Sequence, residues 1–182
     1  MTDASWLRTP GEGRYVRRER EARFLLGGVP DGAVAPRAIE DRYLDGTTLR
    51  LRRVSDGDLE VYKLTQKIRA VADDPAAVAL TNIYLTRSEY DVLASLPAHP
   101  LHKTRREWTV TGRSWAVDEF TDRWTGLVLA EVETDDDIEM QPPLCLDVSH
   151  DDRFSGGALA HADDAAVVAV MSWVRDVVGR CS

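Results

Sequence analysis

Two carboxylates and a guanidinium group alternate along one short segment near the N-terminus: Glu19, Glu21 and Arg23. In a β-strand, side chains two residues apart lie on the same face, so these three charges point to one side. An ordinary half-buried strand shows the reverse pattern, with apolar residues alternating on the buried face. The charged face therefore requires water, partner charges, or a metal ion together with an anion.

The same two-residue offset of charge recurs on at least five segments of the chain. The further sets are Arg50 with Arg52, Lys63 with Thr65 and Lys67, Lys103 with Arg105, Asp118 with Phe120, and Glu131 with Glu133. One such pair is typical of a solvated strand face. The repetition, with acids at the two ends of the series and bases between them, favours a shared charged interior.

The bulk composition is that of a globular protein that has room for one domain. The chain has 182 residues, of which 43% are hydrophobic and 30% charged, and its net charge is −8. This charge argues against a general attraction to nucleic acid or to an anionic membrane, so an anion site must be a local concentration of bases. The two cysteines, Cys145 and Cys181, leave a disulfide open, but no Cys/His cluster suggests zinc held by thiolates. The absence of a long apolar run predicts a cytoplasmic protein.

The elements that must position these charges are mostly short strands joined by tight turns. We expect a flexible N-terminus over 1–13 and a single domain over 14–182, with 69–78 as a connector and the acids 135–137 as a solvated turn. The expected strands are about 14–26, 38–45, 48–54, 59–68, 80–85, 100–111, 114–121 and 126–134.

Two helices complete the expected elements. Thr86 and Glu89 form a capping-box pattern before a helix over 88–96. A closing helix over 164–179 carries one apolar face, and we expect this face to pack against the outside of the sheet.

Eight mostly antiparallel strands that point charge to one side suggest a mainly β fold, a closed barrel with a polar interior. A barrel of this size either fills with side chains or holds one small ligand. Because unpaired charges are costly to bury, the interior must be wet, internally paired, or completed by ions.

At this point the sequence resembles the CYTH, or triphosphate tunnel metalloenzyme, superfamily. Its ExExK hallmark corresponds to Glu19-x-Glu21-x-Arg23, and further markers follow in family order over roughly residues 15–160. These are Tyr43 and Asp45, Leu-Arg-Leu-Arg at 49–52, Leu-Thr-x-Lys at 64–67, Lys-Thr-Arg at 103–105, Asp-x-Phe at 118–120 and Glu-Val-Glu at 131–133. The resemblance implies an eight-stranded antiparallel tunnel and a helix after the fifth strand. It also implies metal-dependent hydrolysis or cyclisation of a linear triphosphate.

The resemblance also implies roles for individual residues. The metal ligands for Mg²⁺ or Mn²⁺ would be Glu19, Glu21, Glu131 and Glu133. The residues that grip the phosphates would be Arg23, Arg50, Arg52, Lys63, Lys67, Lys103, Arg105 and Arg153. The catalytic residues would be Arg23, Lys67, Asp118 and Glu131, with Asp118 orienting a basic neighbour. Hard oxygen ligands suit Mg²⁺, and guanidinium groups bind phosphate bidentately.

Two positions depart from the family pattern. Arg23 replaces the hallmark lysine, which keeps the charge and changes its geometry. The predicted strand 80–85 lacks the charges that many members carry there, so the tunnel is less basic. The four histidines are expected in loops or flanking segments at the surface.

The first hypothesis is a triphosphatase that acts on inorganic tripolyphosphate or a small organic triphosphate. An enzyme like class IV adenylyl cyclase and a non-catalytic polyphosphate or nucleotide binder stay open as alternatives. A barrel that carries an apolar ligand conflicts with the charged interior. We expect a small triphosphate as partner, no nucleic acid or membrane, and a monomer or homodimer.

Overall fold

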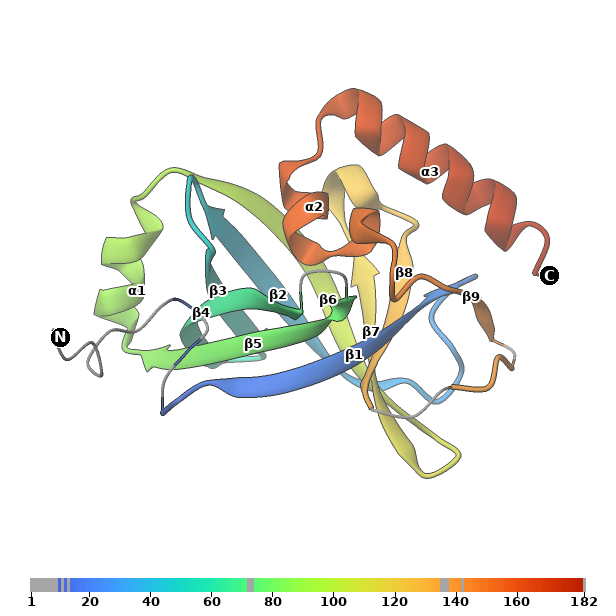
Figure 1. Ribbon diagram of the computed structural model, residues 1–182, viewed down its shortest axis with the longest axis horizontal. Helices are drawn as coiled ribbons and strands as arrows, with labels where there is room; N and C mark the ends of the chain where they lie inside the picture. Colours follow the sequence, from blue (N-terminus) through green and yellow to red (C-terminus); the bar gives the residue numbers. More distant parts are fainter. Residues whose placement is uncertain are drawn as a thin grey trace, which may run out of the picture.

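In the part of the chain that the structure describes, nine β-strands form one antiparallel sheet (Figure 1). The structure is a computed structural model, and it describes residues 10, 12, 14–71, 74–134, 138–141 and 143–181. The strands are β1 (Arg17–Leu26), β2 (Val34–Leu44), β3 (Leu49–Asp56), β4 (Leu59–Val71), β5 (Asp74–Leu85), β6 (Ala98–Val110), β7 (Arg113–Phe120), β8 (Val128–Glu133) and β9 (Leu144–Asp147).

Strand β1 closes this sheet into a barrel because it changes partners along its length. Residues 17–20 pair with β5, and residues 21–26 pair with β8. The strands β1–β8 therefore form the closed eight-stranded antiparallel barrel predicted from the sequence. The short strand β9 pairs with residues 24–26 of β1, along the edge that β5 leaves unpaired and opposite the edge that pairs with β8.

Three details of the strand prediction were wrong. Strand β9 was missed, because four residues after the Pro142–Pro143 pair carry no alternating pattern. The predicted connector 69–78 belongs largely to β4 and β5, which stay paired as far as Val71 and Asp74. Strand β2 begins at Val34, with a register shift before Arg37 that corresponds to a β-bulge. The acids 135–137 and residues 1–9, 11 and 13 of the predicted flexible N-terminus lie outside the described residues.

Three helices flank the barrel: α1 (Arg87–Ala94), α2 (Gly156–His161) and α3 (Asp164–Val178). The predicted capping box is present at α1, where Thr86 and Glu89 satisfy each other's backbone amides. At α3, Asp163 Oδ1 accepts a hydrogen bond of 2.7 Å from Ala166 N. None of the helices in the described ranges is long and apolar enough to cross a membrane.

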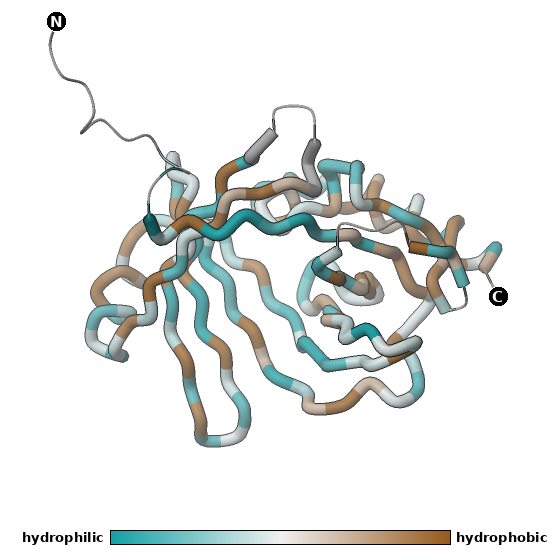
Figure 2. Tube along the Cα trace, turned by 60° about the horizontal axis from the view of Figure 1, so that its bottom comes forward, coloured by the Kyte–Doolittle hydropathy of each residue, from teal (hydrophilic) through white to brown (hydrophobic). Residues whose placement is uncertain are grey.

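The barrel interior changes from charged to apolar along its length. Leu25, Leu101 and Leu129 lie on the same strand faces as inward charges two residues away, and all three are almost completely buried. They belong to a cluster that also holds Trp124 and one face of α3, so the C-terminal helices close this end of the barrel. Figure 2 shows hydrophilic and hydrophobic residues alternating along the strands, which leaves the charged residues to line the remaining interior.

Candidate functional site

The charged part of the barrel interior contains a cavity of about 590 Å³. The cations that line it come from β1, β3, β4 and β6: Arg17, Arg23, Arg50, Arg52, Lys63, Lys67, Arg69, Lys103 and Arg105. The carboxylates that line it are Glu19, Glu21, Glu131, Asp151 and Asp152. The structure therefore brings most of the residues singled out in the sequence into one space.

Strand register explains this convergence. Residues directly opposite each other in neighbouring antiparallel strands share a face, and Arg52 is opposite both Asp41 on β2 and Lys63 on β4. In the same way Arg105 is opposite Asp118 on β7. The alternation within each strand and the register between strands thus place the charges in rows around the inside of the barrel.

Asp41 anchors the first of two buried ion-pair groups. Its carboxylate accepts two hydrogen bonds from Arg52, of 2.6 and 2.7 Å, and lies 3.5 Å from the Arg50 Nε. The Asp41 side chain is 1% exposed. Burial alone would raise the pKa of this carboxyl, but Arg52 and Arg50 hold it well below its usual range. Asp41 is therefore a fixed anion that orients two of the tunnel arginines.

Asp118 anchors the second group and is equally buried. It accepts hydrogen bonds from Arg105 of 2.7 and 2.6 Å and pairs with the Lys103 ammonium. Although burial acts to raise its pKa, the Lys103 and Arg105 charges lower it. The sequence assigned Asp118 to orienting a basic neighbour, and this geometry provides two such neighbours.

Glu131 bridges β1 and β6 across the interior. Its Oε1 accepts from Arg23 Nε at 2.8 Å, and its Oε2 accepts from Arg105 Nη2 at 2.9 Å. Burial would raise the pKa of Glu131, yet the surrounding cations, Arg23 first, lower it well below the usual value. Both carboxylate oxygens are thus engaged by guanidinium groups in this arrangement, which also fixes the Arg23 side chain. The Arg23 backbone N donates to Ser149 Oγ at 2.8 Å, which joins β1 to the segment after β9.

The remaining predicted metal ligands gather where β1 meets β8. Glu21 is opposite Glu133 in the strand register, and both line a neighbouring cavity of about 340 Å³ together with Glu19. The pKa of Glu19 is raised, first by burial and next by the Glu21 charge. A raised carboxyl pKa marks a place where added positive charge is stabilising. The donor set consists of hard carboxylate oxygens, so it fits a divalent ion such as Mg²⁺ or Mn²⁺.

Several salt bridges cross this carboxylate group, among them Arg17 with Glu19 at 3.3 Å and Arg23 with Glu21 at 3.7 Å. Lys67 Nζ lies 2.7 Å from Glu21 Oε2, and Arg17 pairs with Glu133, whose side chain is half exposed. Each carboxylate retains a second oxygen that can serve as a ligand.

Lys63 lies among positive charges, whereas Glu19 lies among negative ones. Its pKa falls from 10.5 to about 8, first because of burial and then because of the charges of Arg52, Arg50 and Arg105. The cavity as a whole is lined, among the described residues, by nine Lys and Arg side chains and five carboxylates.

Like Asp118, which contacts Lys103 and Arg105 from behind, the predicted site residue Arg153 lines neither of these cavities. Its guanidinium group forms hydrogen bonds with the Asp151 carboxylate and lies over the Trp173 ring, 4.8 Å from the ring centroid. Its neighbours Asp151 and Asp152 do line the larger cavity, and Arg69 pairs with Asp152 there. Of the two arginines near Asp151 and Asp152, Arg69 lines the cavity and Arg153 does not.

Sequence reasoning missed several residues of the site. Asp41 stands in a run of three charged residues, Glu40 to Arg42, which hides the alternation. Tyr43 was noted only as a motif residue, although it lines the cavity and hydrogen bonds with Arg50. Other missed residues include Arg17 and Arg69, which continue the two-residue spacing of their strands and could have been found by it. Ser149 was also missed, and neither spacing nor motif gave a signal for it.

The histidines lie at or near the surface, but two of them were expected in the wrong element. His99 and His102 belong to β6, with side chains 46% and 40% exposed. His161 is the last residue of α2 and also lines the larger cavity. His150 is exposed in a turn after β9.

Comparison with known proteins identifies the fold. No protein-family model matches the sequence, and no curated protein matches it significantly. The solved structures that match with a TM-score above 0.5 include the following two. One is described as the hypothetical protein NE1496, with a TM-score of 0.57, 23% identity, and coverage of 79% of this chain and 98% of the other. The other is described as the inorganic triphosphatase NE1496, with a TM-score of 0.56, 21% identity, and coverage of 80% and 95%. The fold implied by the sequence resemblance is thereby confirmed.

Proposed function

We propose that this chain is an enzyme that hydrolyses a linear triphosphate, inorganic tripolyphosphate or a small organic triphosphate, with the help of Mg²⁺ or Mn²⁺. The observation that carries the proposal is the lining of the larger cavity, in which nine Lys and Arg side chains of the described residues face five carboxylates. The pKa of Lys63, lowered to about 8 first by burial and then by neighbouring guanidinium groups, agrees with this excess of positive charge. A polyanion bound there would supply the missing negative charge. The fold shared with a structure described as an inorganic triphosphatase supports the same conclusion.

In this proposal the tunnel cations hold the phosphate chain. Arg50, Arg52 and Arg105 present guanidinium forks, which match the geometry of phosphate oxygens. The lysines contribute compact charges that follow the substrate more flexibly. Asp41 and Asp118 hold these cations in place before the substrate arrives, so less reorganisation is required when it binds. The residues assigned to phosphate binding in the cavity are Arg23, Arg50, Arg52, Lys63, Lys67, Lys103 and Arg105.

The divalent ion would be held by Glu19, Glu21 and Glu133, with Glu131 beside them. When bound, the ion supplies charge stabilisation to the phosphoryl oxygens. Lys67 already contacts Glu21, so its ammonium connects the carboxylate group with the phosphate-binding cations. Arg23, fixed by Glu131, is placed to stabilise negative charge that develops on a departing phosphate. Asp118 acts as a positioning residue for Lys103 and Arg105.

The test is a phosphate-release assay on the purified chain with tripolyphosphate, thiamine triphosphate and ATP. Release should require Mg²⁺ or Mn²⁺ and stop when a chelator is added. Glu21→Gln should lower turnover by about a hundredfold, because it removes a charged ligand near the reacting group. Glu119→Gln is the matched control, since Glu119 carries the same group on the outer side of the barrel and pairs with Arg106.

Four results would contradict the proposal. Phosphate release that is absent with every substrate, or that persists without a divalent ion, would do so. Tight tripolyphosphate binding by calorimetry without turnover would identify a binding protein, and cyclic AMP formed from ATP would identify a cyclase.

A further inference from the structure

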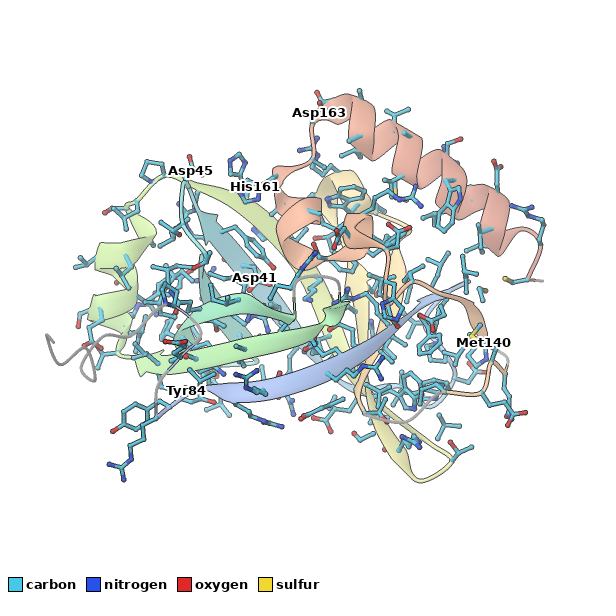
Figure 3. All side chains as sticks on the ribbon, viewed as in Figure 1. Asp41, Asp45, Tyr84, Met140, His161 and Asp163 are labelled. Atoms are coloured by element: carbon cyan, nitrogen blue, oxygen red, sulfur yellow. The ribbon has the colours of Figure 1, made fainter. Side chains whose placement is uncertain are left out.

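A second group of potential metal ligands lies away from the tunnel carboxylates. Asp45, His99 and His161 each offer one ligand atom, and these atoms lie within 4.8 Å of one another. The three residues come from the turn after β2, from β6 and from the end of α2, so they are far apart in the sequence. Asp45 and His161 are labelled in Figure 3, near the edge of the barrel that α2 covers.

The fold holds these three residues together through local contacts. Tyr43 and His99 are opposite each other in the β2–β6 register, and Asp45 N donates to Pro97 O at 3.0 Å. As a result, Asp45 Oδ1 lies 3.2 Å from His99 Nε2. The His99 and His161 rings stand 4.3 Å apart, centroid to centroid.

Glycine at the start of α2 permits this approach. A Cβ atom on Gly156 would overlap the Tyr43 hydroxyl, so only glycine allows α2 to sit against Tyr43. The His161 ring then contacts the Tyr43 ring edge-on, at 6.3 Å between centroids. The position of His161 is thus set by packing of the helix on the barrel.

The hydrogen bonding of His161 prepares one ring nitrogen for a metal. Its Nδ1 lies 2.8 Å from the Gly157 carbonyl oxygen, which can only accept, so Nδ1 carries the proton. The neutral ring therefore presents Nε2 as the ligand atom. Proteins usually orient a metal-binding histidine through a hydrogen bond from the ring nitrogen that does not bind the metal.

We infer that Asp45, His99 and His161 form a site for Zn²⁺ or a similar transition-metal ion that joins α2 to the edge of the barrel. Two imidazoles and a carboxylate suit Zn²⁺, whereas Mg²⁺ prefers oxygen ligands alone. Ligand bonds of about 2.0–2.2 Å place neighbouring donors roughly 3.3 Å apart in a tetrahedral site, close to the Asp45–His99 distance. Since all three side chains are exposed, small rotamer changes suffice to bring the third donor in.

This site lies at the border of the proposed triphosphate site, because His161 also lines the larger cavity. Its ligands include none of the tunnel glutamates, and its preference is for a softer ion. Three protein ligands leave a coordination position for water. Because the ligands come from three separate elements, ion binding should also raise the thermal stability of the chain.

The test is a Zn²⁺ titration of the chelator-treated, tag-free full chain by calorimetry, together with the absorption spectrum of its Co²⁺ complex. His99→Gln and His161→Gln should each weaken Zn²⁺ binding by at least about tenfold and reduce the tetrahedral Co²⁺ bands. Thermal unfolding of the variants without metal checks that they fold. Asp45→Asn provides a further variant in which both rings remain.

His102→Gln is the matched control, because His102 also lies on β6 and pairs with Asp122 at 2.6 Å but is not part of the three-residue group. It should leave Zn²⁺ affinity unchanged, as should Glu119→Gln on the outer side of the barrel. Unchanged Zn²⁺ binding in His99→Gln and His161→Gln would overturn the inference, as would an equal loss in His102→Gln.

Discussion

The barrel interior contains two kinds of charge that differ in their partners. Around Asp41 and Asp118, each buried carboxylate is matched by two cations, and the pKa of each carboxyl is lowered. Around Lys63 and Glu19, burial first and neighbouring charges of the same sign next move the pKa of each group towards its neutral form. The carboxylates of the first kind are held in their charged form by the protein itself, whereas an added ligand of opposite charge would stabilise the second kind.

This difference separates residues that build the site from residues that bind. A matched buried pair is costly to break, because removing one partner leaves the other charge buried and alone. A crowded group gains when a ligand of opposite charge arrives. The phosphate chain should therefore contact the cations near Lys63, and the divalent ion should contact the carboxylates near Glu19.

The largest effect should come from removing a matched anion. Asp118→Ala leaves Lys103 and Arg105 buried without their shared partner, so we expect a loss of about 3–5 kcal/mol in the free energy of unfolding. Urea denaturation measures this loss. The next residue, Glu119, faces outward and pairs with Arg106, so Glu119→Ala should change stability by less than about 1 kcal/mol. Equal losses in the two variants would contradict the comparison.

A smaller loss in the free energy of unfolding should follow when a substitution keeps the charge and changes the geometry of its hydrogen bonds. Arg52→Lys keeps a cation beside Asp41 and loses the two parallel hydrogen bonds, so stability should fall by about 2 kcal/mol. Arg53→Lys is the control, because Arg53 lies on the opposite face of β3 and pairs with Glu40 at the surface. Urea denaturation of both variants tests the difference. A stable Arg52→Lys would show that charge alone holds the group.

Period-two alternation predicts much of this site because charged strand faces are rare enough to be recognised. The segments with Glu19 and Glu21, with Arg50 and Arg52, and with Lys103 each place charge on alternate residues. The count of eight antiparallel strands with charge on one side suggested closure of the sheet, and the family resemblance implied the same barrel. The structure agrees with both, since these residues line one cavity inside a closed barrel.

What could not be predicted depends on contacts between distant segments. Asp41 is masked by charged neighbours on both sides, so only its pairing with β3 reveals that it faces inward. The position of β9 depends on an edge of β1 that β5 leaves uncovered. The group of Asp45, His99 and His161 has no local spacing at all, because the fold alone brings it together.

The crowded cations should make triphosphate binding depend on pH. Free Lys63 loses its proton near pH 8, and a bound polyanion favours the charged form, so affinity should fall as pH rises above about 8. The fall should be up to about tenfold per pH unit, because one proton is taken up on binding. Calorimetry with tripolyphosphate, without a divalent ion, measures it across this range. Lys63→Arg stays charged and should remove this step, so a variant with the wild-type profile would contradict the assignment.

The smallest expected effect is a difference in tripolyphosphate affinity between variants of two arginines at the edge of the site. Arg69 lines the cavity, whereas Arg153 lies over the Trp173 ring with its guanidinium group bound to Asp151. Arg69→Ala should weaken tripolyphosphate binding by a few-fold, because one partly screened phosphate contact at an exposed position is worth about 1 kcal/mol or less. Arg153→Ala should weaken it less, and calorimetry of the two variants gives the ratio. If Arg153→Ala has the larger effect, this arginine must leave Trp173 and contact the substrate, in agreement with the phosphate-binding role that the family resemblance implied. Arg153 in this C-terminal segment would then belong to the residues that bind the substrate.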